Sequence, residues 1–205
     1  NIYKFSGALN YIVPAVSSEE IVKRQRTGEK IDLQQTKSYS SGPLQIDAQI
    51  LGAPYILSNG DGNLGNVPNP ESIITFNIRN RGSGSVVGSQ IDSGALEITF
   101  PPELDIVRKS AVGTETKAEN DKFTCTPRSN GGMMCKNDRR SADGKEALGV
   151  IPIYREETRS SIRFTVKLKQ PLAEPFRSYQ ITAKVTYNYE LRNSVDVTIN
   201  PFQNV

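Results

Sequence analysis

The chain has 205 residues, enough to bury a substantial core within one domain. Lys and Arg number 25 against 22 Asp and Glu, and these basic residues are scattered rather than gathered in a block, so nucleic acid is not expected as a partner. The chain contains no His, which excludes Ser-His-Asp triads, Cys-His dyads and His-ligated zinc or copper sites.

The sequence shows no targeting or membrane-spanning segment. No apolar stretch reaches the roughly 20 residues that a bilayer span requires, and no signal-peptide pattern opens the chain. Because the sequence starts at Asn1 without a Met, we interpret it either as an exported chain whose leader or anchor was removed or as a piece of a longer one. Membrane contact is expected only through an anchor that is removed or lies outside this sequence.

Residues 1–42 are predicted to form an N-terminal extension and linker, followed by one domain over residues 43–205. The apolar residues 4–16 precede a short helix, which Ser18 would cap and Gly28 would end. The polar, Ser-rich residues between this helix and the Gly-Pro pair at the start of the domain are typical of a linker.

The extension carries apolar side chains that are unlikely to be left in water. These are Ile2, Tyr3, Phe5, Leu9, Tyr11, Ile12 and Val13. Two arrangements are open: the segment packs on its own domain as an edge strand or flap, or it adds a strand to the sheet of a neighbouring subunit. We expect the second arrangement, with this segment acting as an assembly arm.

From Pro43 onward the apolar pattern has a period of two, which is typical of half-buried strands. Leu44, Ile46, Ala48 and Ile50 share one face, and Ile74, Phe76 and Ile78 share another. Further strands are predicted over residues 95–100, 122–126, 150–154, 161–168, 179–191 and 194–200. Because no convincing helix separates these strands, we predict an all-β fold, an antiparallel Ig-like β-sandwich with an N-terminal extension containing a short helix.

The segments at 74–88 and 95–107 carry a resemblance to a known family. The strand ending in Ile-Arg-Asn-Arg-Gly at 78–82, followed by Phe-Pro-Pro-Glu-Leu at 100–104, resembles Ig-like surface repeats of bacteria and archaea, of the CARDB and DUF11 kind. The resemblance covers only part of the chain, and the two cysteines and the first 42 residues have no counterpart in it. It implies a non-catalytic extracellular module used for display, spacing or adhesion.

The turn in this segment also has a local explanation. Gly82 and Gly84 are predicted to take a positive φ at no steric cost, and the side chain of Asn80 is predicted to hydrogen-bond its own turn.

Cys125 and Cys135 lie symmetrically about Asn130. If residues 129–131 form a three-residue hairpin loop with Gly131 in the left-handed conformation, the two cysteines face each other across the ladder. We therefore predict a disulfide, which would contribute roughly 2–3 kcal/mol and indicates an oxidising, extracytoplasmic compartment.

The stretch SNGDGNLGN offers a weak calcium site. Asn59, Asp61 and Asn63 occupy alternate positions, as the first three ligands of an EF-type loop do. Leu64 stands in place of the glycine of that loop, however, and Pro70 in place of its closing Glu. We favour an exposed turn over a calcium site, and we predict neither a metal nor a cofactor.

The remaining candidate for a catalytic site is the pair of carboxylates Glu103 and Asp105. Glycosidases use two carboxyl groups of this kind for general acid and general base catalysis. A solvated strand end explains this pair better, so no enzyme is predicted.

We expect an extracellular or cell-surface structural or adhesive module, such as a subunit of a polymer or sheath, with self-association or other surface proteins as partners. The alternative is a module that binds glycan or protein through the loops at one end of the sandwich, although the chain has no Trp for a sugar platform.

Overall fold

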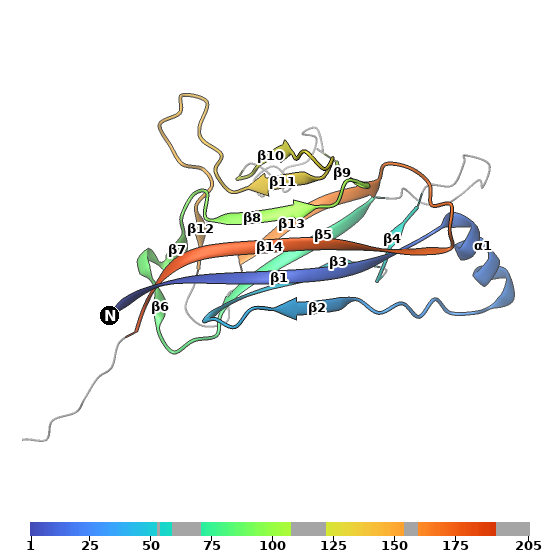
Figure 1. The fold of residues 1–205 in the computed structure, drawn as a ribbon, viewed down its shortest axis with the longest axis horizontal. Helices are drawn as coiled ribbons and strands as arrows, with labels where there is room; N and C mark the ends of the chain where they lie inside the picture. Colours follow the sequence, from blue (N-terminus) through green and yellow to red (C-terminus); the bar gives the residue numbers. More distant parts are fainter. Residues whose placement is uncertain (53, 59–70, 108–121, 154–159, 192–205) are drawn as a thin grey trace, which may run out of the picture.

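The computed structural model describes residues 1–52, 54–58, 71–107, 122–153 and 160–191. These residues form mostly antiparallel β-sheets and one α-helix, which confirms the all-β prediction (Figure 1). The described residues include no helix long and apolar enough to cross a membrane.

The larger sheet has its strands in the order β10-β11-β8-β14-β1-β2. Their bounds are Thr124–Pro127 for β10, Met133–Lys136 for β11, Leu96–Phe100 for β8, Phe176–Glu190 for β14, Ile2–Val16 for β1 and Thr36–Tyr39 for β2. Two short strands extend this sheet: β4 (Ile56–Leu57) pairs with β1, and β6 (Ser85–Val86) pairs with β14.

The smaller sheet has its strands in the order β3-β5-β13-β9. Their bounds are Leu44–Leu51 for β3, Ser72–Asn80 for β5, Ser160–Leu168 for β13 and Leu104–Ile106 for β9. A separate pair joins β7 (Gln90–Ile91) to β12 (Ile151–Pro152), next to the 3-10 turn η1 (Val87–Ser89).

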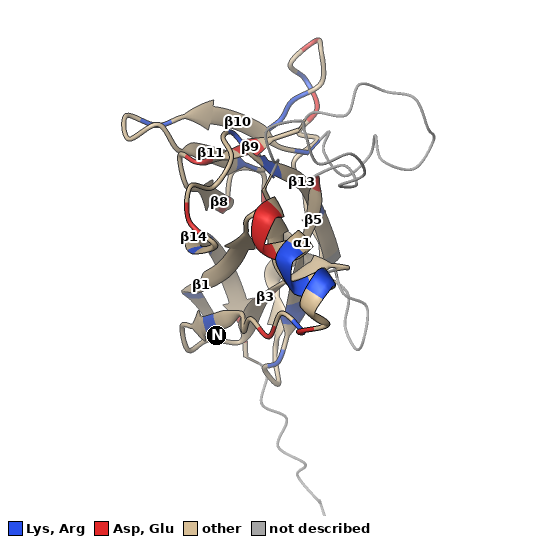
Figure 2. Ribbon diagram, turned by 90° about the vertical axis from the view of Figure 1, so that its right-hand side faces the viewer, with Lys and Arg blue, Asp and Glu red and all other residues tan. Residues whose placement is uncertain are grey.

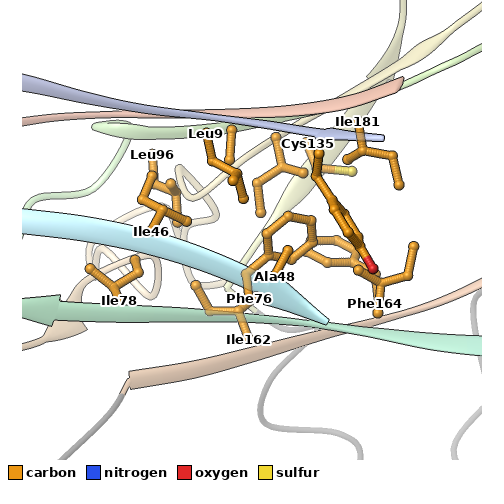
Figure 3. Close-up of a cluster of buried hydrophobic side chains, with 14 of the residues drawn as sticks. Leu9, Ile46, Ala48, Phe76, Ile78, Leu96, Cys135, Ile162, Phe164 and Ile181 are labelled. Atoms are coloured by element: carbon orange, nitrogen blue, oxygen red, sulfur yellow. The ribbon is translucent and has the colours of Figure 1, made fainter. Parts of the chain in front are cut away.

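The core lies between the two sheets, which pack face to face (Figure 3). Alternate residues of β3 and β14 are buried, as their period of two requires. Phe76 of β5 and Phe164 of β13 meet Phe100 of β8 across this space, with ring centres 6.3 and 5.2 Å from that of Phe100. These contacts between rings of opposite sheets hold the sheets together as one sandwich.

The prediction of a separate N-terminal arm is wrong. Strand β1 pairs with β14 over its whole length, from Ile2 opposite Glu190 to Val16 opposite Phe176. Leu9, Tyr11 and Val13 are buried in the common core, Phe5 and Ile12 are half-buried, and only Ile2 and Tyr3 of the predicted arm are exposed. The apolar residues of this segment are covered because alternate positions face the smaller sheet of the same chain.

The division at residue 42 does not separate two structural units. Both β1 and β2 belong to the same sheet as β14 and β8, and β2 lies within the predicted linker. The residues before Pro43 therefore contribute strands to the sandwich instead of tethering it.

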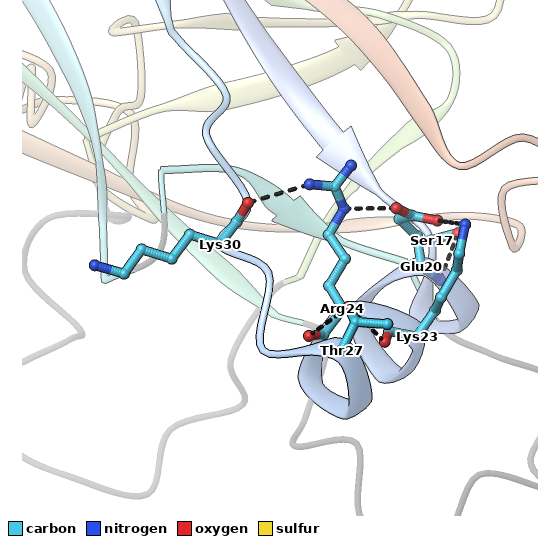
Figure 4. Close-up of polar contacts among 6 residues, drawn as sticks. All are labelled: Ser17, Glu20, Lys23, Arg24, Thr27 and Lys30. Atoms are coloured by element: carbon cyan, nitrogen blue, oxygen red, sulfur yellow. Dashed lines mark hydrogen bonds and ion pairs between the residues drawn. The ribbon is translucent and has the colours of Figure 1, made fainter.

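Helix α1 (Ser18–Thr27) connects β1 to the segment that leads into β2. Its N-cap is Ser17, one residue before the predicted Ser18, and the Ser17 hydroxyl accepts a hydrogen bond from the Glu20 amide at 3.3 Å. Gly28 ends the helix in the left-handed conformation, with φ 72°. Arg24 lies 2.6 Å from the Glu20 carboxylate and donates to the Lys30 carbonyl, which ties the helix to the chain that follows it (Figure 4).

Two of the predicted strands lie partly or wholly outside the described residues. The strand predicted over 150–154 appears as the shorter β12, and the one predicted over 194–200 is outside the described part of the chain.

Candidate functional site

The predicted disulfide is confirmed. Cys125 of β10 and Cys135 of β11 are directly opposite in the ladder and are joined by an S–S bond of 2.03 Å. The loop between them has the expected form, since Gly131 has φ 80° and the Arg128 amide donates to the Gly132 carbonyl at 2.8 Å. The bond closes the hairpin at one edge of the larger sheet, and it is typical of an oxidising, non-cytosolic environment.

The weak calcium candidate is not tested. Asn59, Asp61 and Asn63 lie outside the described residues. Among the residues that the structure does describe, no group of three or more Cys, Asp or Glu side chains is arranged to hold a metal ion.

The turn after β5 holds its shape through Asn80, as predicted, but its glycines have a different role. The Asn80 side chain accepts from the Gly82 amide at 3.0 Å and donates to the Gly84 carbonyl at 2.9 Å. Neither glycine is among the described residues with positive φ. A Cβ at Gly82 would lie 2.3 Å from the Tyr189 hydroxyl, and one at Gly84 would lie 2.2 Å from the Glu190 carbonyl oxygen, so glycine is required by close approach to β14.

The carboxylates of Glu103 and Asp105 take part in different ion pairs. Asp105 lies 4.0 Å from the Lys167 ammonium, and Glu103 lies 3.8 Å from the Arg177 guanidinium. Both carboxylates are partly exposed and each faces a cation, an arrangement typical of a solvated surface.

Glu103 belongs instead to a cleft at the end of the sandwich, which we call the distal cleft. It has a volume of about 440 Å³, within the range of small-ligand sites. The turn between β8 and β9, the connection from β13 to β14 and the first residues of β14 form its walls. The principal lining residues are Pro102, Glu103, Lys169, Leu172, Arg177 and Tyr179.

Arg177 is the central charged group of the distal cleft. Its guanidinium lies 3.8 Å from the Glu103 carboxylate, 3.7 Å from that of Glu174 and 5.7 Å from the ring centre of Tyr179. Burial of Tyr179 raises the pKa of its hydroxyl, although the positive charge of Arg177 acts against this rise. The cleft thus combines an arginine, a lysine and two carboxylates with the apolar surface of Pro102 and Leu172.

Hydrogen bonds from the backbone hold the walls of the distal cleft in place. The Lys169 amide donates to the Glu103 carbonyl at 2.9 Å, and the Leu172 amide donates to the Ser58 hydroxyl at 2.8 Å. The Ser17 amide, at the start of α1, donates to the Pro175 carbonyl at 3.0 Å. These bonds fix the walls of the cleft relative to one another, and a fixed site loses less entropy on binding than a loose one.

The distal cleft lies far from the end of the sandwich where β1 begins and β14 ends. Arg177 pairs with Ala15 near one end of β14, whereas Glu190 pairs with Ile2 at the other. A strand of 15 residues is about 45 Å long. Figure 2 views the molecule from the end that carries the cleft, with the acidic first turn and basic last turn of α1 towards the viewer.

The lining of the distal cleft is suited to non-covalent binding. It combines charged side chains, the Tyr179 ring and apolar surface, and none of its lining residues is a Ser, Thr or Cys. Charges of both signs suit a ligand or partner segment that itself carries charged or hydrogen-bonding groups. Sequence reasoning missed this site because Glu103 and Arg177 are far apart in the sequence and no local pattern predicts their meeting.

A second feature missed by sequence reasoning is the protection of the β3 edge of the smaller sheet. The Leu44 amide donates to the Tyr187 hydroxyl at 2.9 Å, and the Ala48 amide donates to the Asp47 side chain at 2.8 Å. The backbone of Ile50 hydrogen-bonds the hydroxyl of Tyr11. Side chains thus hydrogen-bond the backbone groups that an added strand would need. We call residues 44–50 of β3 the guarded edge.

The guarded edge is also tied to the larger sheet. The Tyr11 hydroxyl donates to the Gln35 side chain at 2.5 Å, and Gln35 in turn donates to the Pro54 carbonyl at 3.1 Å. Lys37 of β2 forms an ion pair of 2.8 Å with Asp47 of β3, which bridges the two sheets at this side of the sandwich.

No family model, curated protein or solved structure matches this chain.

Proposed function

We propose that this chain is a non-catalytic structural or adhesive module of an extracellular or cell-surface assembly, built as an Ig-like sandwich that associates with itself or with other surface proteins. The observation that carries this proposal is the layout of β1 and β14. The chain enters β1 and leaves β14 at one end of the sandwich, where the Leu191 amide donates to the Asn1 carbonyl at 3.1 Å. The distal cleft lies at the opposite end, so a module attached at the end where β1 begins and β14 ends would present that cleft outward.

Three further observations support the proposal. The disulfide between Cys125 and Cys135 fits a protein that works in an oxidising compartment. The chain has no His, which the common hydrolase triads and dyads require. The resemblance of residues 74–107 to bacterial and archaeal surface repeats points in the same direction.

Electron microscopy of the native material tests this function. We expect filaments or a lattice, because a rigid sandwich that associates with itself is suited to repeated arrangement. Sedimentation of the purified full chain should show association that increases with protein concentration. Discrete single-copy particles in the native material, together with a purely monomeric purified chain, would contradict the proposal.

A second candidate function is favoured by the distal cleft, namely a module that binds a charged glycan or protein segment. Arrays of glycans and of charged peptides provide the probes. If the cleft is the binding site, Arg177→Ala should weaken binding of any array hit by about tenfold or more, because it removes a charged hydrogen-bond donor. Lys184→Ala, on the outer face of β14, is the matched control and should leave binding unchanged. Equal binding by both variants would exclude the distal cleft as the site.

A further inference from the structure

One stretch of β1 has a sheet edge that is not covered by the described residues. On the side away from β14, β2 pairs only with residues 9–12 of β1, and β4 only with residues 15–16. Ser40 extends this cover by one residue, through its hydrogen bonds with Ala8. Residues 2–6 have no paired strand on that side within the described part of the chain, and we call them the open edge.

The hydrogen bonds of Ala8 show which backbone groups of the open edge point away from β14. The Ala8 amide donates to the Ser40 side chain at 2.7 Å and its carbonyl accepts from the Ser40 amide at 2.9 Å, so both groups point away from β14. In an antiparallel strand, alternate residues direct both backbone groups to the same side. Ile2, Lys4 and Ser6 therefore each present an N–H and a C=O at the open edge, ready for a further strand.

The side chains of the open edge narrow the choice of partner. Ile2 is 63% exposed and Tyr3 46% exposed, so an added strand would cover apolar surface. Two copies of the open edge, paired about a two-fold axis centred on Lys4, would place two ammonium groups directly opposite each other, which is destabilising. The complementary strand must instead carry an acidic residue opposite Lys4 and apolar residues beside Tyr3 and Phe5.

The chain itself contains such a sequence. Residues 194–200, Ser-Val-Asp-Val-Thr-Ile-Asn, place one acidic residue between two valines. In an antiparallel register with Asp196 opposite Lys4, Val195 lies opposite Phe5 and Val197 lies opposite Tyr3. Opposite charges then meet on the outer face, and apolar residues meet on the face where the Phe5 ring already stacks on Tyr187, at 6.0 Å between ring centres.

Strand direction favours a segment from another copy over the segment of the same chain. Strand β14 runs antiparallel to β1 and ends beside its first residues, where the Leu191 amide donates to the Asn1 carbonyl. If the same chain turned back along the free side of β1, it would run parallel to β1 and lose the antiparallel register with Lys4. A segment from another copy can approach in the antiparallel direction.

We propose that residues 194–200 of one copy add as a strand to the open edge of another copy, with Asp196 next to Lys4. This inference rests on the proposed self-association and names the surfaces that carry it. It also reverses the role expected of the N-terminal segment, which accepts a strand instead of donating one.

Charge reversal in the full chain tests the proposal. Lys4→Asp and Asp196→Lys should each weaken self-association, measured by sedimentation, by about tenfold, because an attractive pair becomes repulsive. The double variant should recover most of the loss. A mixture of the two single variants should form pairs, because one provides a matching edge and the other a matching segment. Lys184→Asp is the control for a change of charge on the same sheet face and should associate like the unmodified chain.

The outcomes separate this inference from the function on which it rests. If the unmodified chain associates but the single reversals leave association unchanged, or the double variant does not recover, the strand-addition inference is wrong while the proposed self-association stands. If the single variants fail to pair when mixed, the contact between copies is likewise refuted. If the unmodified chain remains monomeric, the strand-addition inference and the proposed self-association are both refuted, while association with other surface proteins is tested by the native material. Circular dichroism of each variant confirms that the sandwich is folded.

Discussion

The guarded edge of β3 and the open edge of β1 are two edges of the same sandwich that differ in whether their outward backbone groups are hydrogen-bonded. At the guarded edge, Tyr187, Tyr11 and Asp47 occupy backbone groups of β3. At the open edge, Ile2, Lys4 and Ser6 present their backbone groups with no partner among the described residues. An unpaired edge recruits other strands unless it is blocked. The contrast indicates that strand addition is hindered at the β3 edge of the smaller sheet and permitted at residues 2–6 of β1 in the larger sheet.

Two of the three covering groups at the guarded edge come from the larger sheet, which explains how the edge is protected without an additional strand. Tyr11 and Tyr187 belong to β1 and β14 and reach across the sandwich with their hydroxyls. Their rings fill the core while their hydroxyls satisfy the backbone, so each side chain serves packing and edge protection together.

The largest effect is expected from breaking the guarded edge. Replacing both tyrosines, as Tyr11→Phe with Tyr187→Phe, leaves the buried amides of Ile50 and Leu44 without their partners, at about 1–3 kcal/mol each. The two sites are separated along the strands, so their effects should add to about 2–6 kcal/mol in urea unfolding. Light scattering should also show more aggregation, because the β3 edge can then accept strands.

The exposed Tyr3 supplies the control for this experiment. Tyr3→Phe removes the same atom at a site that is 46% exposed and should change the free energy of unfolding by less than about 0.5 kcal/mol. Equal effects of the buried pair and of Tyr3 would show that the hydroxyl bonds to β3 do not protect this edge.

An intermediate effect is expected at a third margin, where the disulfide closes the β10–β11 hairpin. Cys125→Ala with Cys135→Ala should lower the free energy of unfolding by roughly 2–3 kcal/mol, because the unfolded chain gains the entropy of an open loop. Reduction of the unmodified protein should reproduce this loss in the same urea titration. Free thiols found by alkylation of freshly isolated native protein would contradict both the bond and the oxidising compartment.

The smallest effect concerns the ion pair that bridges the sheets beside the guarded edge. Burial raises the pKa of Asp47, but the hydrogen bond and charge of Lys37, with those from the Tyr39 hydroxyl and the Ala48 amide, outweigh it and hold the pKa below its ordinary value. Because the pair is partly exposed, Asp47→Asn should cost only about 0.5–1 kcal/mol at neutral pH.

The pH dependence of this cost follows from the lowered pKa. A carboxylate with a lowered folded pKa contributes its stability above the unfolded value of about 3.9 and loses it as the pH falls through the folded value. The difference between the unmodified chain and Asp47→Asn should therefore be constant at neutral pH and decline below about pH 4. A difference that grows on acidification would show that Asp47 is destabilising in the folded state.

Local patterns in the sequence predicted much of the fold and little of the candidate site. The alternation at 44–50 and 161–168 predicted β3 and β13, because one face of each strand must be apolar to pack on the other sheet. The distal cleft was not predicted, because Glu103 and Arg177 are brought together by the pairing of whole strands. The guarded edge was missed for a similar reason, since nothing in the sequence near Leu44 indicates the hydroxyl of Tyr187.

By itself, the sequence determined the features that depend on neighbouring residues: the period of the strands, the left-handed Gly28 and Gly131, and the cysteines that face each other across a short loop. Only the tertiary structure decided the place of residues 2–16, which an apolar pattern fits equally well as a donated arm or as a central strand. The partner of Tyr11 in the ladder is Ile181, at the other end of the chain. Strand pairing over such a separation depends on which complete arrangement buries the most apolar surface, and no short stretch of sequence contains that information.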